Sequence, residues 1–155
     1  MLAYLLLRRG EEISRQQLAF LFWPDSTEKQ ARTNIRNLLH QLRRSLPASD
    51  RYLYVTRTYV LWIEDSPYWL DVAAFEAALK TVSEHPYARQ DAIRQADALY
   101  RGELLPHLYD DWVLTAREDY HQRFMGALES LVAELEVERE TTTAITYAQR
   151  LLKLG

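Results

Sequence analysis

The segment from Thr27 to Leu46, TEKQARTNIRNLLHQLRRSL, concentrates cationic and amide side chains. At helical spacing they form one face and its two flanks, made of Lys29, Arg32, Thr33, Asn34, Arg36, Asn37, His40, Gln41, Arg43 and Arg44. No acidic residue lies between Lys29 and Asp50. Such side chains donate hydrogen bonds to phosphate oxygens and to base edges in the major groove of DNA. The segment therefore has the chemistry to bind an anionic partner.

The apolar residues of the same segment predict the element that positions these side chains. They recur at i, i+3, i+4 and i+7, and they are Ala31, Ile35, Leu38, Leu39, Leu42 and Leu46. This spacing has the period of about 3.6 residues of one helical face and excludes a strand. Because like charges repel along a helix, a face of one sign is slightly destabilising without a partner. An ordinary basic surface helix remains the alternative from this segment alone.

A shorter helix is expected before this one. Ser14 reads as the N-cap of a helix from Arg15 to Trp23, with Gln17 completing a capping-box pattern. Glu11 to Ile13 reads as a short extended link before it, and residues 2–7 as a first apolar helix. Pro24 stops the second helix, and Asp25 or Ser26 can cap the long one. Two helices joined by a short turn, the second longer and basic, are typical of a helix-turn-helix.

A β-hairpin is expected directly after the basic helix. In RYLYVTRTYVLWI, residues 52–56 alternate as a strand does, and Tyr59 to Ile63 are β-branched, aromatic or aliphatic. The turn falls near Arg57 and Thr58. A hairpin in this position is a wing, whose tip arginine can reach a phosphate or a minor groove. The alternative is that Arg57 is a polar turn residue without a partner.

Composition sets the limits for these elements. A chain of 155 residues suits one domain or two small ones, and its aliphatic and aromatic content is that of a folded protein. The absence of cysteine excludes disulfides, zinc fingers and thiol catalysis. Without a signal peptide or an apolar run that could span a membrane, we expect a cytoplasmic protein that does not bind membranes.

The net charge of −3 conceals a division along the chain. Residues 1–63 hold ten Lys and Arg against five Asp and Glu, whereas residues 64–155 hold nine against seventeen. The first part is therefore basic and the second acidic. This asymmetry favours a basic half that meets a polyanion and an acidic half with another role.

Longer stretches resemble a known family. ISRQQLAFLFWPDSTEKQARTNIRNLLHQLRRSL followed by YLYVTRTYVLWI is similar to the OmpR-type winged helix of the SARP-type bacterial activators. WLDVAAFEAAL, LYRGELLP and YDDWVLTAREDYHQR resemble the bacterial transcriptional activator domain that follows it in that family. The resemblance implies a mainly α fold, with a winged helix-turn-helix and β-hairpin wing over residues 1–66 and a tetratricopeptide-like helical domain over residues 67–155. We expect the family's N-terminal sheet to be missing and the C-terminal domain to be truncated.

The second half reads as helical throughout. Helices are expected after Leu70 and Asp71 up to His85, then over residues 88–100, 111–138 and 144–152. The segments AIRQADAL, from Ala92, and AITYAQRL, from Ala144, share the pattern A-I-x-x-A-x-x-L, which is typical of the second helix of a tetratricopeptide-like pair. We expect Leu151, Leu152 and Leu154 to form an exposed apolar surface on the last helix.

Little in the sequence points to catalysis. His107, Asp110, Asp111 and His121 are the one group of metal-type ligands, and a loop with helix-capping aspartates explains them better than a metal or acid-base site. No glycine-rich phosphate loop is present. We expect Tyr100, Tyr109 and Trp112 to anchor the helical core. The sequence thus predicts a protein that is not an enzyme and that has no metal site and no cofactor.

The leading hypothesis is a sequence-specific, DNA-binding transcriptional activator with helix 27–46 in the major groove. The base-contacting residues would be Thr33, Arg36, Asn37, His40 and Gln41, and the phosphate-contacting residues Arg32, Arg43, Arg44, Arg57 and Thr58. Double-stranded DNA would be the partner, and the acidic helical half would serve homodimerisation or contact with RNA polymerase. The alternative is a protein–protein interaction module without DNA binding. Loss of DNA affinity with rising salt would separate the two.

Overall fold

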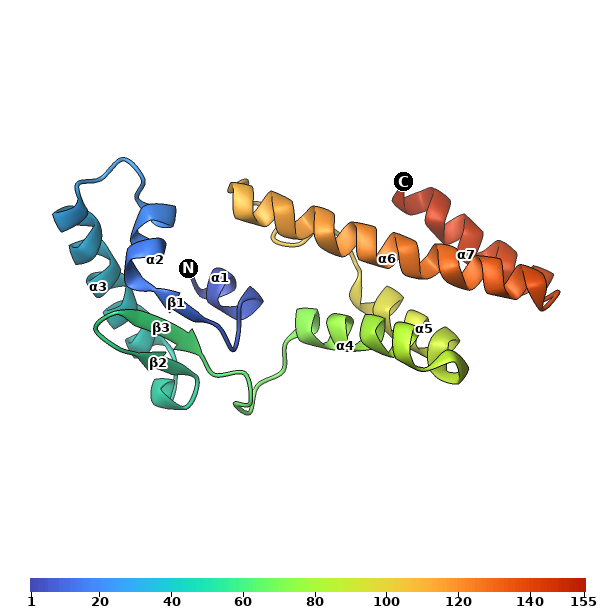
Figure 1. Ribbon diagram of the computed structural model, residues 1–155, viewed down its shortest axis with the longest axis horizontal. Coiled ribbons are helices and arrows are strands. Elements are labelled where there is room, and N and C mark those ends of the chain that lie inside the picture. Colours follow the sequence, from blue (N-terminus) through green and yellow to red (C-terminus); the bar gives the residue numbers. More distant parts are fainter. The chain divides into compact units, whose positions relative to one another are not determined.

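The computed structural model describes residues 1–155 and is mainly helical, with seven α-helices and one small sheet (Figure 1). The chain divides into two compact units, Met1–Tyr68 and Trp69–Gly155. This division falls two residues later than the boundary expected between residues 66 and 67. None of the helices combines the length and the apolar content that crossing a membrane requires.

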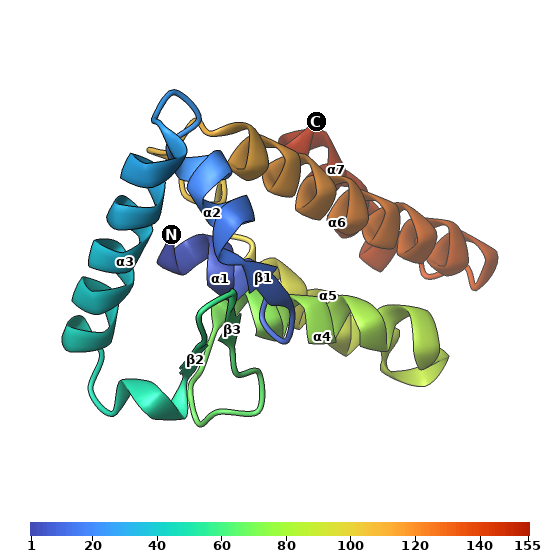
Figure 2. The ribbon, with the colours of Figure 1, turned by 60° about the vertical axis from the view of Figure 1, so that its left-hand side comes forward.

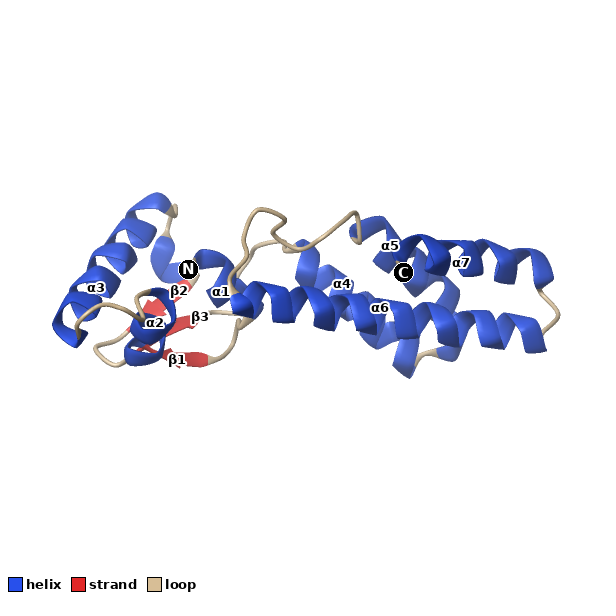
Figure 3. Cartoon of the chain, turned by 90° about the horizontal axis from the view of Figure 1, so that it is seen from above, coloured by secondary structure: helices blue, strands red, loops and turns tan.

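The first unit builds its core between helices and a three-stranded sheet. Its elements are α1 (Leu2–Leu7), β1 (Glu12–Ser14), α2 (Arg15–Phe22), α3 (Glu28–Ser45), the 3-10 helix η1 (Ser49–Arg51), β2 (Leu53–Val55) and β3 (Tyr59–Trp62). The strands are antiparallel in the order β1-β3-β2, and Val60 pairs with both Ile13 and Val55 (Figure 3). Leu5, Leu18, Ile35, Leu53 and Val60 are completely buried. These apolar side chains hold α3 against the rest of the unit.

The hairpin predicted from the sequence is present, and its central strand has a second partner. The short extended link expected at Glu11 to Ile13 is extended over Glu12 to Ser14, where it forms strand β1, and its pairing with β3 was not predicted. Gly10, at a φ of 80°, turns the chain from α1 into this strand, and its amide donates to the carbonyl of Trp62 (2.9 Å). Left-handed backbone of this kind is accessible to glycine without a steric cost.

Two side-chain caps set the starts of α2 and α3. The hydroxyl of Ser14 accepts from the amide of Gln17 (3.0 Å), which confirms the predicted cap of α2. The cap of α3 is Thr27, whose Oγ1 accepts from the amide of Gln30 (3.3 Å). The expectation that Asp25 or Ser26 caps this helix is wrong, because the turn after Pro24 carries the chain further before helical geometry begins.

The second unit consists of helices alone. They are α4 (Asp71–Glu84), the 3-10 helix η2 (Pro86–Ala88), α5 (Arg89–Leu99), α6 (Asp111–Val137) and α7 (Thr141–Leu154). Helices α4 and α5 form one antiparallel pair, and α6 and α7 form another (Figure 1). Phe75, Ile93, Phe124, Leu128 and Leu135 lie in a single core cluster. This unit therefore has a hydrophobic core of its own.

The predicted aromatic anchor and the predicted apolar surface are correct only in part. Tyr100 packs on Phe124 with ring centroids 5.0 Å apart, but Tyr109 is exposed in the loop before α6. Leu151 and Leu154 pack against the core, whereas Leu152 is 83% exposed. Ile145 is also exposed, although its counterpart Ile93 is completely buried, so the repeated pattern has different burial in the two helices.

Candidate functional site

Helix α3 presents the predicted polar face to solvent. The helix packs against α2 within the first unit (Figure 2). Ala31, Ile35 and Leu39 are buried on its inner side, while Arg36, Asn37, His40 and Gln41 are exposed. Thr33 is half-buried, and its hydroxyl donates to the carbonyl of Lys29 (3.1 Å). The five predicted base-contacting residues thus lie on one helix, and four of them are exposed.

The arginines of α3 fall into two groups. Arg32 binds the carboxylate of Glu28, and Arg43 Nη2 lies 2.5 Å from Asp50 Oδ1. Arg36 and Arg44 are exposed and form no hydrogen bond or ion pair within the chain. All these side chains keep access to solvent, where an ion pair contributes only about 0–1 kcal/mol. A polyanion can therefore replace the carboxylate at Arg32 and Arg43 and meets no competitor at Arg36 and Arg44.

The β2–β3 turn is held by the side chain of Thr56 rather than by a glycine. Its Oγ1 accepts from the amides of Thr58 (3.2 Å) and Tyr59 (2.9 Å) and donates to the carbonyl of Tyr59 (3.1 Å). These bonds leave the Arg57 and Thr58 side chains exposed at the tip. The turn therefore presents the Arg57 side chain on a backbone that the Thr56 side chain holds in place.

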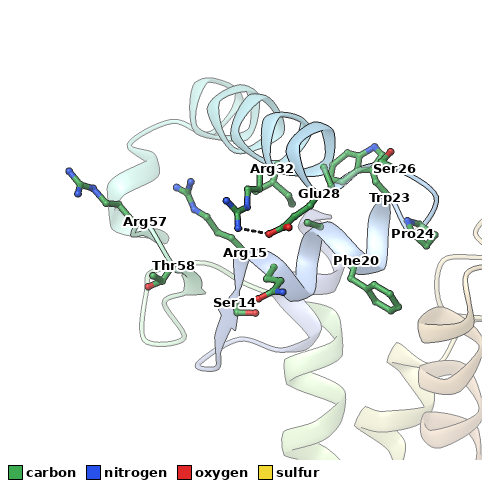
Figure 4. A pocket seen from close by; sticks show the side chains of 14 residues that line it. Ser14, Arg15, Phe20, Trp23, Pro24, Ser26, Glu28, Arg32, Arg57 and Thr58 are labelled. Atoms are coloured by element: carbon green, nitrogen blue, oxygen red, sulfur yellow. Dashed lines mark hydrogen bonds and ion pairs between the residues drawn. The ribbon is translucent and has the colours of Figure 1, made fainter.

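A pocket of about 630 Å³ lies where α2, α3 and this turn meet. Arg15 from the start of α2, Arg32 from α3 and Arg57 from the turn all line it, and Figure 4 shows Arg15 between the other two in that view. Glu28 is its one acidic lining residue. Sequence reasoning missed Arg15, which it treated as a helix-starting residue. The backbone bond from the Arg15 amide to the Thr58 carbonyl (2.8 Å), which places it beside the turn, has no sequence signal.

The other group of titratable residues does not form a site. His121 Nδ1 lies 3.2 Å from the hydroxyl of Tyr100, and no three His, Asp or Glu side chains are arranged to hold a metal ion. Burial, with a smaller contribution from the Glu103 carboxylate, raises the pKa of Tyr100 above its usual value. This hydroxyl therefore stays protonated at neutral pH and serves the packing of the helices.

Comparison with protein families assigns the second unit. Residues 70–154 match the family described as bacterial transcriptional activator domain. The match covers more than half of the chain. The chain belongs to the bacterial transcriptional activator domain family, a regulatory family with a general role in transcription activation rather than an enzyme family. Comparison with curated protein sequences finds no match.

Proposed function

We propose that the protein is a sequence-specific, DNA-binding transcriptional activator in which residues 1–66 form an OmpR-type winged helix. The order helix, strand, helix, longer helix and hairpin in the first unit supports this assignment. The observation that carries it is the outer face of α3, where Arg36, His40 and Arg44 are exposed and without partners in the chain. An isolated cationic face of this kind is stabilised by a polyanion.

In this proposal α3 lies in the major groove of double-stranded DNA. Arg36 is the strongest candidate for a bidentate contact with guanine, and Asn37 and Gln41 offer the amide geometry that suits adenine. Thr33 and His40 complete the base-contacting set. Phosphates are held by Arg43 and Arg44 from α3 and by Arg57 and Thr58 from the turn. Arg32 joins them when it leaves Glu28.

The helical unit then serves activation rather than DNA recognition. Its net charge is negative, so it does not add to phosphate binding, and its family membership assigns it to transcription activation. We assign it contact with RNA polymerase or pairing with a second copy of the chain. Both roles use surfaces of a rigid helical scaffold and need no catalytic group.

The test measures binding of the full chain to fluorescent duplexes by anisotropy, using a sequence enriched from random DNA and an unrelated one. Arg36→Ala should weaken binding to the enriched sequence by about 1–3 kcal/mol and relax specificity at one base pair. Arg44→Ala should weaken binding to both duplexes alike and reduce the salt slope by about 1. Arg94→Ala removes an exposed arginine of α5 and serves as the control for net charge.

The same experiment distinguishes a DNA-binding activator from a protein–protein interaction module. A protein–protein interaction module predicts no DNA affinity at low salt, and a chain that binds neither duplex there would discard the proposal. Equal affinities of the Arg36 and Arg44 variants and of the Arg94 control would discard the assigned face. We expect the DNA affinity of the unaltered chain to fall steeply as the salt concentration rises. The affinity of the Arg44 variant should fall less steeply.

A further inference from the structure

The pocket between α2, α3 and the β2–β3 turn is lined by two arginines, Arg15 and Arg57, and neither forms an ion pair within the chain. The hydrogen bond from the Arg15 amide to the Thr58 carbonyl (2.8 Å) joins the start of α2 to the turn. The side chains of Arg15 and Arg57 therefore leave the backbone close together, and both line the pocket. Adjacent like charges repel unless an anion lies between them or nearby. The arrangement is one that a bound anion would stabilise.

Neither of these arginines is neutralised within the chain. Arg15 and Arg57 form no ion pair and no side-chain hydrogen bond, and Nε of Arg15 is buried without an acceptor. A buried donor without an acceptor is destabilising, because it has lost its bond to water and gained none in return. An acceptor in the pocket would satisfy this N–H group. Oxygen atoms of an anion supply that acceptor and the opposite charge together.

The third arginine of the pocket, Arg32, differs from the other two because it has an ion-pair partner. Arg32 binds Glu28, the one carboxylate in the lining, so this pair adds no net charge (Figure 4). The net cationic charge of the pocket thus comes from Arg15 and Arg57. Guanidinium groups match the geometry of phosphate oxygens, and two of them can hold one phosphate from two sides.

We propose that Arg15 and Arg57 together bind one phosphate group in this pocket, and that Glu28 reduces the affinity by holding Arg32 away from it. A volume of about 630 Å³ leaves room for one phosphate group and for the part of a larger ligand that is joined to it. The phosphate belongs either to the DNA backbone, in which case this inference rests on the proposed function, or to a free phosphate compound. The shared chemistry is a tetrahedral oxyanion held by two guanidinium groups.

The first arm of the test uses DNA and the full chain. Arg15→Gln and Arg57→Gln should each weaken binding to a duplex several-fold and lower the slope of log affinity against log salt by about 0.9. The double variant should lower that slope by about 0.9 as well, rather than by twice as much, because holding the one phosphate requires both residues and it is already released when either is lost. Glu28→Gln, which frees Arg32, should raise the affinity. Arg94→Gln is the control.

The second arm follows the Nε–Hε signal of Arg15 by NMR, assigned by its loss in Arg15→Gln. Inorganic phosphate at millimolar concentration should shift this signal in the unaltered chain and not in Arg57→Gln, which changes only an exposed turn residue and should retain the fold. A shift with the duplex identifies the DNA backbone as the source. A shift with inorganic phosphate but not with the duplex identifies a free phosphate compound.

The outcomes separate this inference from the proposed function. If the unaltered chain binds DNA and the Arg15 and Arg57 variants bind as the Arg94 control does, with no movement of the Arg15 signal by either probe, the phosphate pocket is refuted while the proposed function stands. If the chain does not bind DNA but inorganic phosphate moves the signal, the proposed function fails and the pocket stands. Additive slope changes in the double variant would refute the shared phosphate.

Discussion

Thr27 determines where α3 begins, and this gives a prediction at the scale of a single residue. Its Oγ1 accepts from the amide of Gln30 (3.3 Å) and satisfies one of the first amides of the helix. Thr27→Ala should lower the free energy of unfolding by about 1 kcal/mol, as loss of an N-cap typically does. Urea denaturation of the full chain measures it. Ser26→Ala is the matched control and should change stability by less than about 0.5 kcal/mol; equal losses would contradict the cap.

Individual side chains show what the sequence could and could not predict. The exposure of Arg36 and His40 followed from helical spacing, because the opposite positions are apolar. The pairing of Arg43 with Asp50 could not be predicted in this way, since it depends on how η1 folds back after Pro47. Arg15 was missed for the same reason: its place in the pocket depends on a backbone bond to a residue far along the chain.

At the scale of elements, long amphipathic helices were predictable and the shortest strand was not. Helix α3 has an apolar face of five residues, followed by Leu46 at its C-cap, which is enough to define a period. Strand β1 has three residues, one of them apolar, and it is a strand because β3 offers a free edge for pairing. A pattern of three residues does not distinguish a strand from a loop. The start of α7 at Thr141, three residues earlier than expected, has a similar cause, because its first three residues are all threonines, which favour helices weakly.

The β2–β3 turn gives a prediction for an element. Thr56→Val keeps the side-chain shape but removes an acceptor for two amides and a donor to the Tyr59 carbonyl. We expect a loss of about 1–3 kcal/mol in the free energy of unfolding, because the Tyr59 amide is half-buried and loses a partner. Urea denaturation measures this loss. Thr58→Val, in which no amide loses an acceptor, should retain stability to within about 0.5 kcal/mol. A loss of similar size in both variants would assign the effect to the strand rather than to the turn bonds.

At the scale of the whole molecule, charge and fold divide the chain at nearly the same place. Met1–Tyr68 carries ten Lys and Arg against seven Asp and Glu, and Trp69–Gly155 carries nine against fifteen. The charge counts of residues 1–63 and 64–155 indicated two halves with different roles, and the match to the activator domain family begins at residue 70. The sequence could therefore indicate the class of the second half, whereas the pocket at Arg15 required the folded backbone of the first unit.

This division predicts the behaviour of the second unit on its own. Its core residues, from Phe75 to Ala144, all belong to residues 69–155, so a fragment of that range should fold with a helical circular dichroism spectrum and one cooperative urea transition. Its net negative charge opposes phosphate binding, so it should show no affinity for duplex DNA at a salt concentration where the full chain binds. If the fragment folds and binds DNA as tightly as the full chain, the DNA-binding surface lies on the helical unit and not on α3. A fragment that fails to fold would show that this core needs the first unit for its stability.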